Sequence, residues 1–441
     1  QALSTAQIAG LSTAQFSQIS STTLTALTTA QVVAIELADL QVLLPESITA
    51  LKTEQLQSLT AAQISGLSSQ QIVNLYTTTI SALTTKQIAA IDSSDLALLG
   101  YDVLGVLNAA QVQALNTAQI TSLTSNQISG LNSSFVSNLT SSQLRLLDAS
   151  NLNKLDPISI GAIKESQIVG LTSAQIQGLS NDAIASLNTN SIAALKTSQI
   201  AAITTAQALY LADATLKALT SAQISALTTS AVAVFGYDTI AALRTDQVQA
   251  LNTAQIVALT TQQVVDLNTT TLTALTTKQI AALETSDVAV LTYDNLIALK
   301  PEQLQALTSI QVAGLTSQQL YDMSSATLRN LSTAQVRFIE TSDLVALSVE
   351  SIAYFKTEQL QSLTSAQIAS LSSQQFSNLT TSTLQSLSTA QIAFIETTDI
   401  AVLNVDSLAA LKVDQIKALL TTQVSELTQD QLQGVNSATV S

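Results

Sequence analysis

An eight-residue repeat runs through the chain and limits what the chain can fold into. One copy is residues 27–34, of sequence LTTAQVVA, and the same register continues from Leu3 to Val435 without a skipped or inserted residue. We count about 55 copies, and self-similarity at a fixed period is typical of solenoids and other repeat arrays. We therefore treat the octad as the structural unit and number its positions 1 to 8 from the leucine.

Two positions of the octad are apolar in nearly every copy. Position 1 is Leu in most copies and otherwise Ile, Phe, Met or Val, and position 6 is Ile, Leu, Val or Phe except at Ala208. The alternating steps of five and three between these positions do not match the strict alternation of a half-buried strand. The step of three from position 6 to the next position 1 fits one face of a short helix.

The polar positions supply signals for the start of a helix. Position 2 is often Ser, Thr, Asn or Asp, and position 5 is Gln in just over half of the copies. Thr28 and Gln31 therefore predict a capping box, in which the hydroxyl accepts from a backbone N–H and the Gln side chain reaches back. Pro45, Pro157 and Pro301 all occupy position 3, the first helical residue, where a missing N–H costs nothing.

Glycine marks the other end of the octad. Seven of the eleven glycines occupy position 8, where a helix that begins at position 3 is expected to end.

We therefore predict an all-α fold, an elongated solenoid with one short helix per octad and a tight corner at positions 1 and 2. Ile and Val at position 6 favour strands, so a β-solenoid is the alternative. A helix this short is unstable alone, so the stack is the folding unit.

We expect one continuous array over residues 1–441, a fragment of a longer array, because no linker interrupts the register. The chain is 46% apolar and 10% charged, which is too hydrophobic for disorder. No apolar run is long enough to cross a bilayer. The number of octads per coil is open. If three octads make one coil and coils stack at about 9 Å, the rod is about 160 Å long.

Composition argues against several functions. The chain has no Cys and no His, so it has no thiol nucleophile and no His base for its many hydroxyls. No Walker loop or dinucleotide fingerprint is present, and we expect neither an enzyme nor a cofactor. The net charge of −15 disfavours nucleic acid and anionic membrane surfaces as partners.

A longer period of seven octads, or 56 residues, overlies the short one. Its marker is an octad with Glu or Asp at position 2 and Asp at position 5, which we call an acidic octad. The acidic octads carry Glu36 and Asp39, Asp92 and Asp95, Glu284 and Asp287, Glu340 and Asp343, and Glu396 and Asp399. Between Leu171 and Leu227 this period is lost or shifted by three octads, which indicates an insertion or deletion of whole octads.

The acidic octads and the octads after them are the candidate metal site. Carboxylates there could converge to bind Ca²⁺ through hard oxygen ligands. The candidates are Glu340, Asp343, Glu350, Glu396, Asp399 and Asp406. No EF-hand loop and no Gly-rich nonapeptide is present. The alternative is a solvated stripe that Lys356 partly balances, and such surface pairs are weak. We name no catalytic or cofactor-binding residue.

The column of glutamines at position 5 has two structural interpretations, helix caps or a hydrogen-bonded ladder between coils. A surface rich in Gln and Thr could also bind glycans, and surface glycans are therefore possible partners.

Octads such as residues 27–34 and 83–90 resemble tandem repeats of very large secreted proteins of Gram-negative bacteria, often described as adhesin-like or surface proteins. The resemblance covers essentially the whole chain and rests on composition and period. It implies an extracellular or cell-surface location, an elongated form and a structural or adhesive role. The Gly-rich calcium nonapeptides frequent in such proteins are absent from this chain.

Two functions follow as hypotheses. In the first, the chain is a structural protein that self-associates into a surface filament, sheath or surface layer, because open solenoid ends can join head to tail. In the second, it is the stalk of a secreted adhesin whose binding domain lies outside this chain.

Overall fold

The computed structural model describes residues 3–440, apart from the side chains of Tyr237 and of residues 436–440. The described residues form 54 short helices and no strand. The all-α prediction is therefore confirmed, and the β-solenoid alternative is wrong. The chain divides into two compact units, Gln1–Val234 (unit 1) and Phe235–Ser441 (unit 2), which are described separately. One continuous array over the whole chain stays a prediction.

In unit 1 every third helix belongs to the same column. The first column is α1 (Thr5–Ala9), α4 (Thr29–Val33), α7 (Thr53–Ser58), α10 (Thr77–Ala82), α13 (Tyr101–Leu104), α16 (Ser125–Ser129), α19 (Ala149–Leu152), α22 (Ser173–Gly178), α25 (Thr197–Ile200) and α28 (Ser221–Ala226). The second column is α2 (Thr13–Phe16), α5 (Leu37–Gln41), α8 (Ala61–Ser65), α11 (Thr85–Ala90), α14 (Ala109–Ala114), α17 (Ser133–Asn138), α20 (Pro157–Gly161), α23 (Asn181–Ser186), α26 (Thr205–Ala208) and α29 (Thr229–Ala233). The third column is α3 (Ser21–Thr25), α6 (Pro45–Thr49), α9 (Ser69–Val73), α12 (Ser93–Leu96), α15 (Thr117–Thr121), α18 (Ser141–Arg145), α21 (Glu165–Ile168), α24 (Thr189–Ala193) and α27 (Asp213–Ala218).

Unit 2 has the same organisation. Its first column is α30 (Tyr237–Ala241), α33 (Thr261–Val265), α36 (Thr285–Ala289), α39 (Ser309–Ala313), α42 (Thr333–Val336), α45 (Thr357–Ser362), α48 (Thr381–Ser386), α51 (Val405–Ala409) and α54 (Gln429–Val440). Its second column is α31 (Thr245–Ala250), α34 (Thr269–Ala274), α37 (Tyr293–Ala298), α40 (Ser317–Asp322), α43 (Thr341–Ala346), α46 (Ser365–Ser370), α49 (Thr389–Ala393) and α52 (Val413–Lys417). Its third column is α32 (Thr253–Val257), α35 (Thr277–Ala282), α38 (Pro301–Ala306), α41 (Ser325–Leu328), α44 (Val349–Ala353), α47 (Ser373–Ser377), α50 (Thr397–Val402) and α53 (Thr421–Ser425).

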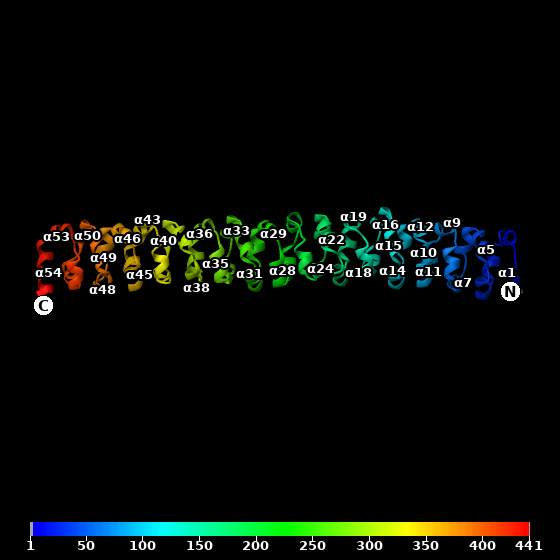
Figure 1. Ribbon diagram of the computed structural model, residues 1–441. Helices are drawn as coiled ribbons and strands as arrows, with labels where there is room; N and C mark the ends of the chain where they lie inside the picture. The colour runs from blue at the N-terminus through cyan, green and yellow to red at the C-terminus, as the bar shows by residue number, and fades with distance from the viewer. Residues whose placement is uncertain (1–2, 441) are drawn as a thin grey trace. The chain divides into compact units, whose positions relative to one another are not determined.

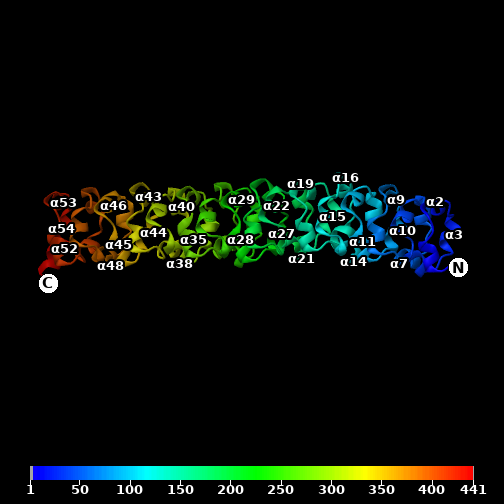
Figure 2. The same cartoon turned by 45° about the vertical axis from the view of Figure 1, so that its right-hand side comes forward.

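Packing within each unit gives the size of a coil, which the sequence left open. Helices pack against the third helix before and the third helix after them in nearly every case. Three octads, or 24 residues, therefore make one coil. Within each unit the coils follow one another in chain order (Figures 1 and 2), so that each coil covers the core of the one before.

The start of each helix is as predicted from the capping residues. Every helix begins at position 3 of its octad, and every helix but α54 ends at position 6, 7 or 8. The residue at position 2 is extended, as at Ser388 with φ −72° and ψ 159°, where the Ser388 hydroxyl accepts from the backbone N–H of Gln391. Pro45, Pro157 and Pro301 each occupy the first turn of a helix.

The apolar positions form a continuous core in each unit. The side chains at positions 1 and 6 are buried in nearly every coil, as for Ile392 (0% exposed) and Leu387 (4%). A β-branched residue costs a helix at most about 0.7 kcal/mol relative to Ala. Burying its side chain contributes about 1.5–3 kcal/mol. Burial therefore outweighs the strand preference of Ile and Val at position 6.

The glycines at position 8 lie at helix ends as predicted, except Gly434 inside α54, but for a different reason. No described glycine has a positive φ, so none uses the left-handed conformation that favours glycine at helix ends. Instead, a Cβ atom at Gly130 would overlap the ring of Tyr101, and one at Gly66 would overlap the side chain of Leu37. Both of those residues occupy position 3 one coil earlier. Glycine at position 8 therefore makes room for a large neighbour in the preceding coil.

Helix α54 is an exception to one helix per octad. It continues from Gln429 through Val435 to Val440, past the position 1 at which every earlier described octad has a corner. No later helix of the described residues packs against this segment, so no neighbouring coil favours a corner there over a continuous helix.

Candidate functional site

A polar side chain at position 5 links one coil to the coil before it in most octads, and we call this contact the joint of that octad. Gln391, at the third residue of α49, is 5% exposed. Its Oε1 accepts from the Ser388 backbone N–H (2.9 Å) and hydroxyl (3.1 Å). Its Nε2 donates to the carbonyls of Leu360 (2.8 Å) and Leu363 (3.1 Å), one coil earlier. All the hydrogen-bonding capacity of this buried amide is therefore used.

The two carbonyls at a glutamine joint lie at the corner between two octads of the preceding coil. Leu360 is position 6 of its octad, near the end of α45, and Leu363 is position 1 of the next. The last carbonyls of a helix lack partners within the helix, and an unsatisfied buried carbonyl costs about 1–3 kcal/mol. The glutamine therefore caps two helices at once, its own at the start and an earlier one at the end.

This geometry recurs in both units. Gln55 donates to Leu24 and Leu27, and Gln279 donates to Val248 and Leu251, each pair 31 and 28 residues earlier. Both structural interpretations of the glutamine column, caps and ladder, are therefore confirmed together. These amides are enclosed and fully bonded, so they offer nothing to an external ligand. Glycan binding stays a prediction, and it would need side chains other than these amides.

Shorter polar side chains at position 5 keep part of the joint. The Ser191 hydroxyl donates to the Ile163 carbonyl at 2.6 Å, and the Asn295 amide donates to the Leu267 carbonyl at 3.4 Å. In both cases the acceptor lies 28 residues earlier, at the position that a glutamine would reach. A side chain with one hydrogen to donate is therefore enough to reach the position-1 carbonyl.

The acidic octads have a different joint, because a carboxylate has no hydrogen to donate. Asp287 accepts from the Thr261 hydroxyl at 3.1 Å, and Asp399 accepts from the Ser373 hydroxyl at 2.5 Å, each at position 3 one coil earlier. Both aspartates are buried, at 1% and 2% exposed. The Oδ2 atoms of both have no hydrogen-bond partner among the described residues.

Burial changes the proton affinity of these aspartates. It raises the pKa of Asp287 and of Asp399, and the nearby charge of Glu284 or Glu396 raises it further, while the hydroxyl hydrogen bond opposes this rise. The pKa of Asp39 is also raised, by burial and by Glu36. The carboxyl groups of Asp39, Asp287 and Asp399 are therefore harder to ionise than a free aspartate.

The six calcium candidates do not form one cluster in unit 2. Glu340, Glu350, Glu396 and Asp406 are exposed, whereas Asp343 and Asp399 are buried. The two acidic octads lie in different columns, α43 in the second and α50 in the third. No group of three or more His, Cys, Asp or Glu side chains that could hold a metal ion occurs in the described part of the chain.

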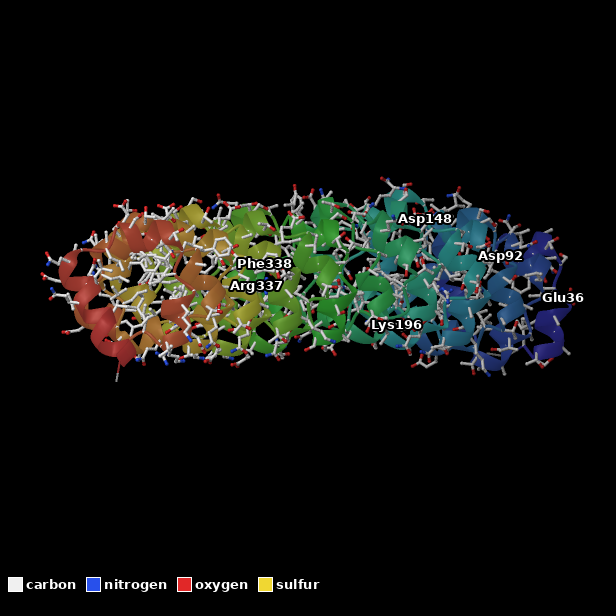
Figure 3. All side chains as sticks on the ribbon, turned by 60° about the vertical axis from the view of Figure 1, so that its left-hand side comes forward. Glu36, Asp92, Asp148, Lys196, Arg337 and Phe338 are labelled. Atoms are coloured by element: carbon white, nitrogen blue, oxygen red, sulfur yellow. The ribbon has the colours of Figure 1, made fainter. Side chains whose placement is uncertain are left out.

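The same separation is seen in unit 1. Glu36 and Asp92 open successive acidic octads and lie well apart along the unit (Figure 3). We assign none of the six candidates in unit 2 as a metal ligand, and calcium binding stays a prediction. Arg244 and Asp246 form an ion pair at 3.0 Å on the surface.

Among the described residues, no helix is both long enough and apolar enough to span a membrane.

Comparisons with known proteins agree with the repeat architecture. A family model described as the ALTTAQ repeat matches residues 88–125, 232–269, 336–373 and 392–429, together about a third of the chain. No curated protein matches. Matching solved structures include "Structure of APUM23-GGAGUUGACGG" and "Structure of APUM23-GGAAUUGACGG", 12% and 11% identical. The matches cover 99% of this chain and 87% and 95% of theirs, at a TM-score of 0.15 each, which is too low for any inference. The chain is a repeat protein similar to the ALTTAQ repeat.

Proposed function

We propose that the protein is a structural, extracellular repeat protein of a bacterial cell surface. In this proposal its coils form a rod, and rods join end to end or side by side into a filament, sheath or surface layer. The location follows from the resemblance to repeats of large secreted bacterial proteins, and the structural role follows from the geometry of the joints.

One observation carries the proposal, the repetition of a single joint from coil to coil. Gln55 in unit 1 and Gln279 in unit 2 make the same pair of bonds to the coil before. A catalytic or binding site needs a few side chains in an arrangement that differs from the rest of the scaffold. A joint that is repeated along the chain suits length and stiffness instead.

The first described coil shows what an uncovered joint presents. Leu3 is 44% exposed, and Gln7 and Gln15 are exposed. One coil later, Gln31 is 4% exposed and its Nε2 donates to the Leu3 carbonyl at 2.5 Å. A further coil, from the same chain or from a second copy, would cover the first coil in the same way. In the proposal, end-to-end association would use contacts of this kind.

Electron microscopy of the purified full chain tests the proposal. We expect particles with a length of about 160 Å, from 9 Å per coil, and longer filaments of the same width at higher concentration. Gln7→Glu with Gln15→Glu removes two donors from the uncovered coil and should shorten the filaments. Glu350→Gln, an exposed change elsewhere, should leave them unchanged. Compact particles, or lengths that do not depend on concentration or on Gln7 and Gln15, would contradict the proposal.

Imaging of the native cell surface separates this proposal from the second hypothesis. Ordered fibres or lattices that contain this chain support a structural assembly. Isolated thin stalks that end in another domain would support an adhesin stalk.

A further inference from the structure

Two buried oxygen atoms of unit 2 have no hydrogen-bond partner, and they occupy equivalent places. They are the Oδ2 atoms of Asp287 in α36 and Asp399 in α50. Each aspartate is almost fully buried, and its other carboxyl oxygen already accepts a hydroxyl hydrogen bond from the preceding coil. A buried charged oxygen without a partner is costly. The same cost recurs at two equivalent joints, so it calls for an explanation.

Each joint also contains a backbone carbonyl without a donor. The carbonyls 28 residues before Asp287 and Asp399 belong to Leu259 and Leu371, which are 5% and 3% exposed. No hydrogen bond to either carbonyl oxygen occurs among the described residues. At glutamine joints the equivalent carbonyl always faces an amide hydrogen, as Leu363 faces Gln391. Each of these two joints therefore has two acceptors without a donor, the Oδ2 atom and the carbonyl, and no hydrogen left to satisfy them.

Other octads show that one hydrogen from position 5 satisfies that carbonyl. The Ser191 hydroxyl and the Asn295 amide both donate to the carbonyl 28 residues earlier. A neutral carboxyl group is a donor of the same kind, with one O–H.

We propose that Asp287 and Asp399 act as protonated carboxyl groups that donate Oδ2–H to the Leu259 and Leu371 carbonyls, so that these two joints tighten in mildly acidic surroundings. On closing, each joint takes up one proton from solvent, and on opening at higher pH it releases that proton. A proton needs no volume, whereas Ca²⁺ needs six to eight oxygens at about 2.3–2.6 Å. Both Oδ2 atoms are already closed off from solvent.

The charged surroundings of the two aspartates are simple. Glu284 acts on Asp287 and Glu396 acts on Asp399, in each case from the same octad. The helices packed on α36 are α33 and α39, and those packed on α50 are α47 and α53. None of these four helices contains a titratable or charged residue. Asp266 and Glu426 follow α33 and α53, and both are surface residues at the ends of those helices.

The sign of the pH effect follows from the raised pKa of both aspartates, for which burial is the main cause. The folded state then binds protons more tightly than the unfolded chain. Stability contributed by the neutral carboxyl is fully present below the ordinary aspartate pKa near 3.8. It is lost as pH rises through the raised pKa. This property goes beyond the proposed structural role and does not depend on it.

The test uses the full chain and the double variant Asp287→Asn with Asp399→Asn, because asparagine keeps a donor at every pH. At pH 7 the double variant should melt roughly 2–4 °C above the wild type. This is the shift in melting temperature expected for a small gain in unfolding free energy in a unit of about 200 residues. The difference should disappear as pH falls toward 4. Glu350→Gln with Asp406→Asn makes the same charge change at exposed sites and should show neither effect.

A second readout observes the proton itself. Isotope-edited infrared spectra of aspartate-labelled protein should show a protonated, hydrogen-bonded carboxyl band in the wild type at a pH above the ordinary aspartate pKa near 3.8, absent from the double variant. The proposal is overturned if that band is missing, or if wild type and double variant melt with the same pH dependence. It is also overturned if Ca²⁺ at constant pH, rather than protons, stabilises the wild type and not the double variant. Filament length does not enter either readout, so the proposed function can fail or survive independently.

Discussion

Two neighbouring octads of unit 2 have the same core and opposite joints. In α49 and α50 the position-6 residues, Ile392 and Ile400, are both fully buried. At position 5, however, Gln391 donates two hydrogen bonds to the preceding coil, whereas Asp399 donates none and accepts one. The comparison teaches that hydrophobic burial can hold successive coils together where the polar joint donates no hydrogen bond, and that the polar joint determines how complete and how pH-dependent that contact is.

The largest expected effect is common to both octads. Ile392→Ala and Ile400→Ala should each lower the free energy of unfolding by about 2–5 kcal/mol, because each removes a fully buried side chain and leaves a cavity. Guanidinium denaturation followed by circular dichroism measures both losses. If the two losses differ by more than the spread between repeated measurements, the cores of the two octads are not equivalent, and the comparison fails.

The next effect separates the octads. Gln391→Ala leaves the Leu363 carbonyl without a donor, whereas the Leu360 carbonyl keeps the Leu363 backbone N–H, so the substitution should cost about 1–3 kcal/mol, as for one unsatisfied buried group. Asp399→Ala removes a buried carboxylate and should cost clearly less at pH 7. The same denaturation experiment compares them, and equal losses would show that the amide bonds contribute nothing specific.

A single substitution should convert one kind of joint into the other. Gln391→Glu keeps the acceptor for Ser388 but loses both donors, so we expect a loss of about 1–3 kcal/mol at pH 7. The loss should shrink on acidification, because a protonated Glu regains one donor. Gln7→Glu, at an exposed position, is the matched control. A loss that does not change between pH 7 and pH 4.5 would contradict this interpretation.

An aspartate with satisfied hydrogen bonds should show the opposite pH dependence. At Asp156 burial alone would raise the pKa, but hydrogen bonds from Ser159 and from the Ile158 backbone N–H outweigh it and lower the pKa. Its stabilisation is present above the ordinary aspartate pKa and is lost as pH falls through the lowered one. Asp156→Ala should cost about 1 kcal/mol at pH 7, as for other helix caps, and less in acid. Thermal melts from pH 7 to pH 3 measure this, and a cost that grows in acid would refute it.

The smallest effect concerns the partner charge in an acidic octad. Glu396→Gln removes a like charge and should lower the pKa of Asp399, although burial, the main cause of the raised value, remains. The wild type should therefore lose stability with rising pH slightly more than the variant does. Nuclear magnetic resonance titration of the Asp399 carboxyl carbon measures the shift. Glu350→Gln, in the next octad, is the control and should leave that titration unchanged.

The sequence predicted the helical solenoid because its local signals agreed with one another. Position-2 caps, the prolines at position 3 and the apolar positions 1 and 6 all indicate the same short helix, and each is a local property of the chain. The size of the coil could not be predicted, because it depends on which octads touch, and nearly identical octads do not distinguish a partner three octads away from one two octads away. Contact between Gln391 and Leu363 crosses 28 residues.

The candidate site was predicted less completely, and the reasons are physical. The glutamine column was recognised as structural, but its double role needs both coils to be visible. The glycines were expected to mark helix ends, and only the position of Tyr101 beside Gly130 shows why a side chain is excluded there. The acidic residues were expected either to converge on Ca²⁺ or to form a solvated stripe. Burial of Asp287 and Asp399 follows from their place at position 5, which is enclosed in coils that pack on a preceding coil.

The coil of three octads and the long repeat of seven octads have different periods, and the longer is not a multiple of the shorter. Seven is two full coils plus one octad, so each long repeat advances its acidic octad by one column, as α36, α43 and α50 do within unit 2. A given column therefore meets an acidic octad only once in three long repeats. The shift of three octads in unit 1 is one complete turn. Whole turns can therefore be gained or lost by duplication without rotating any later octad onto another face.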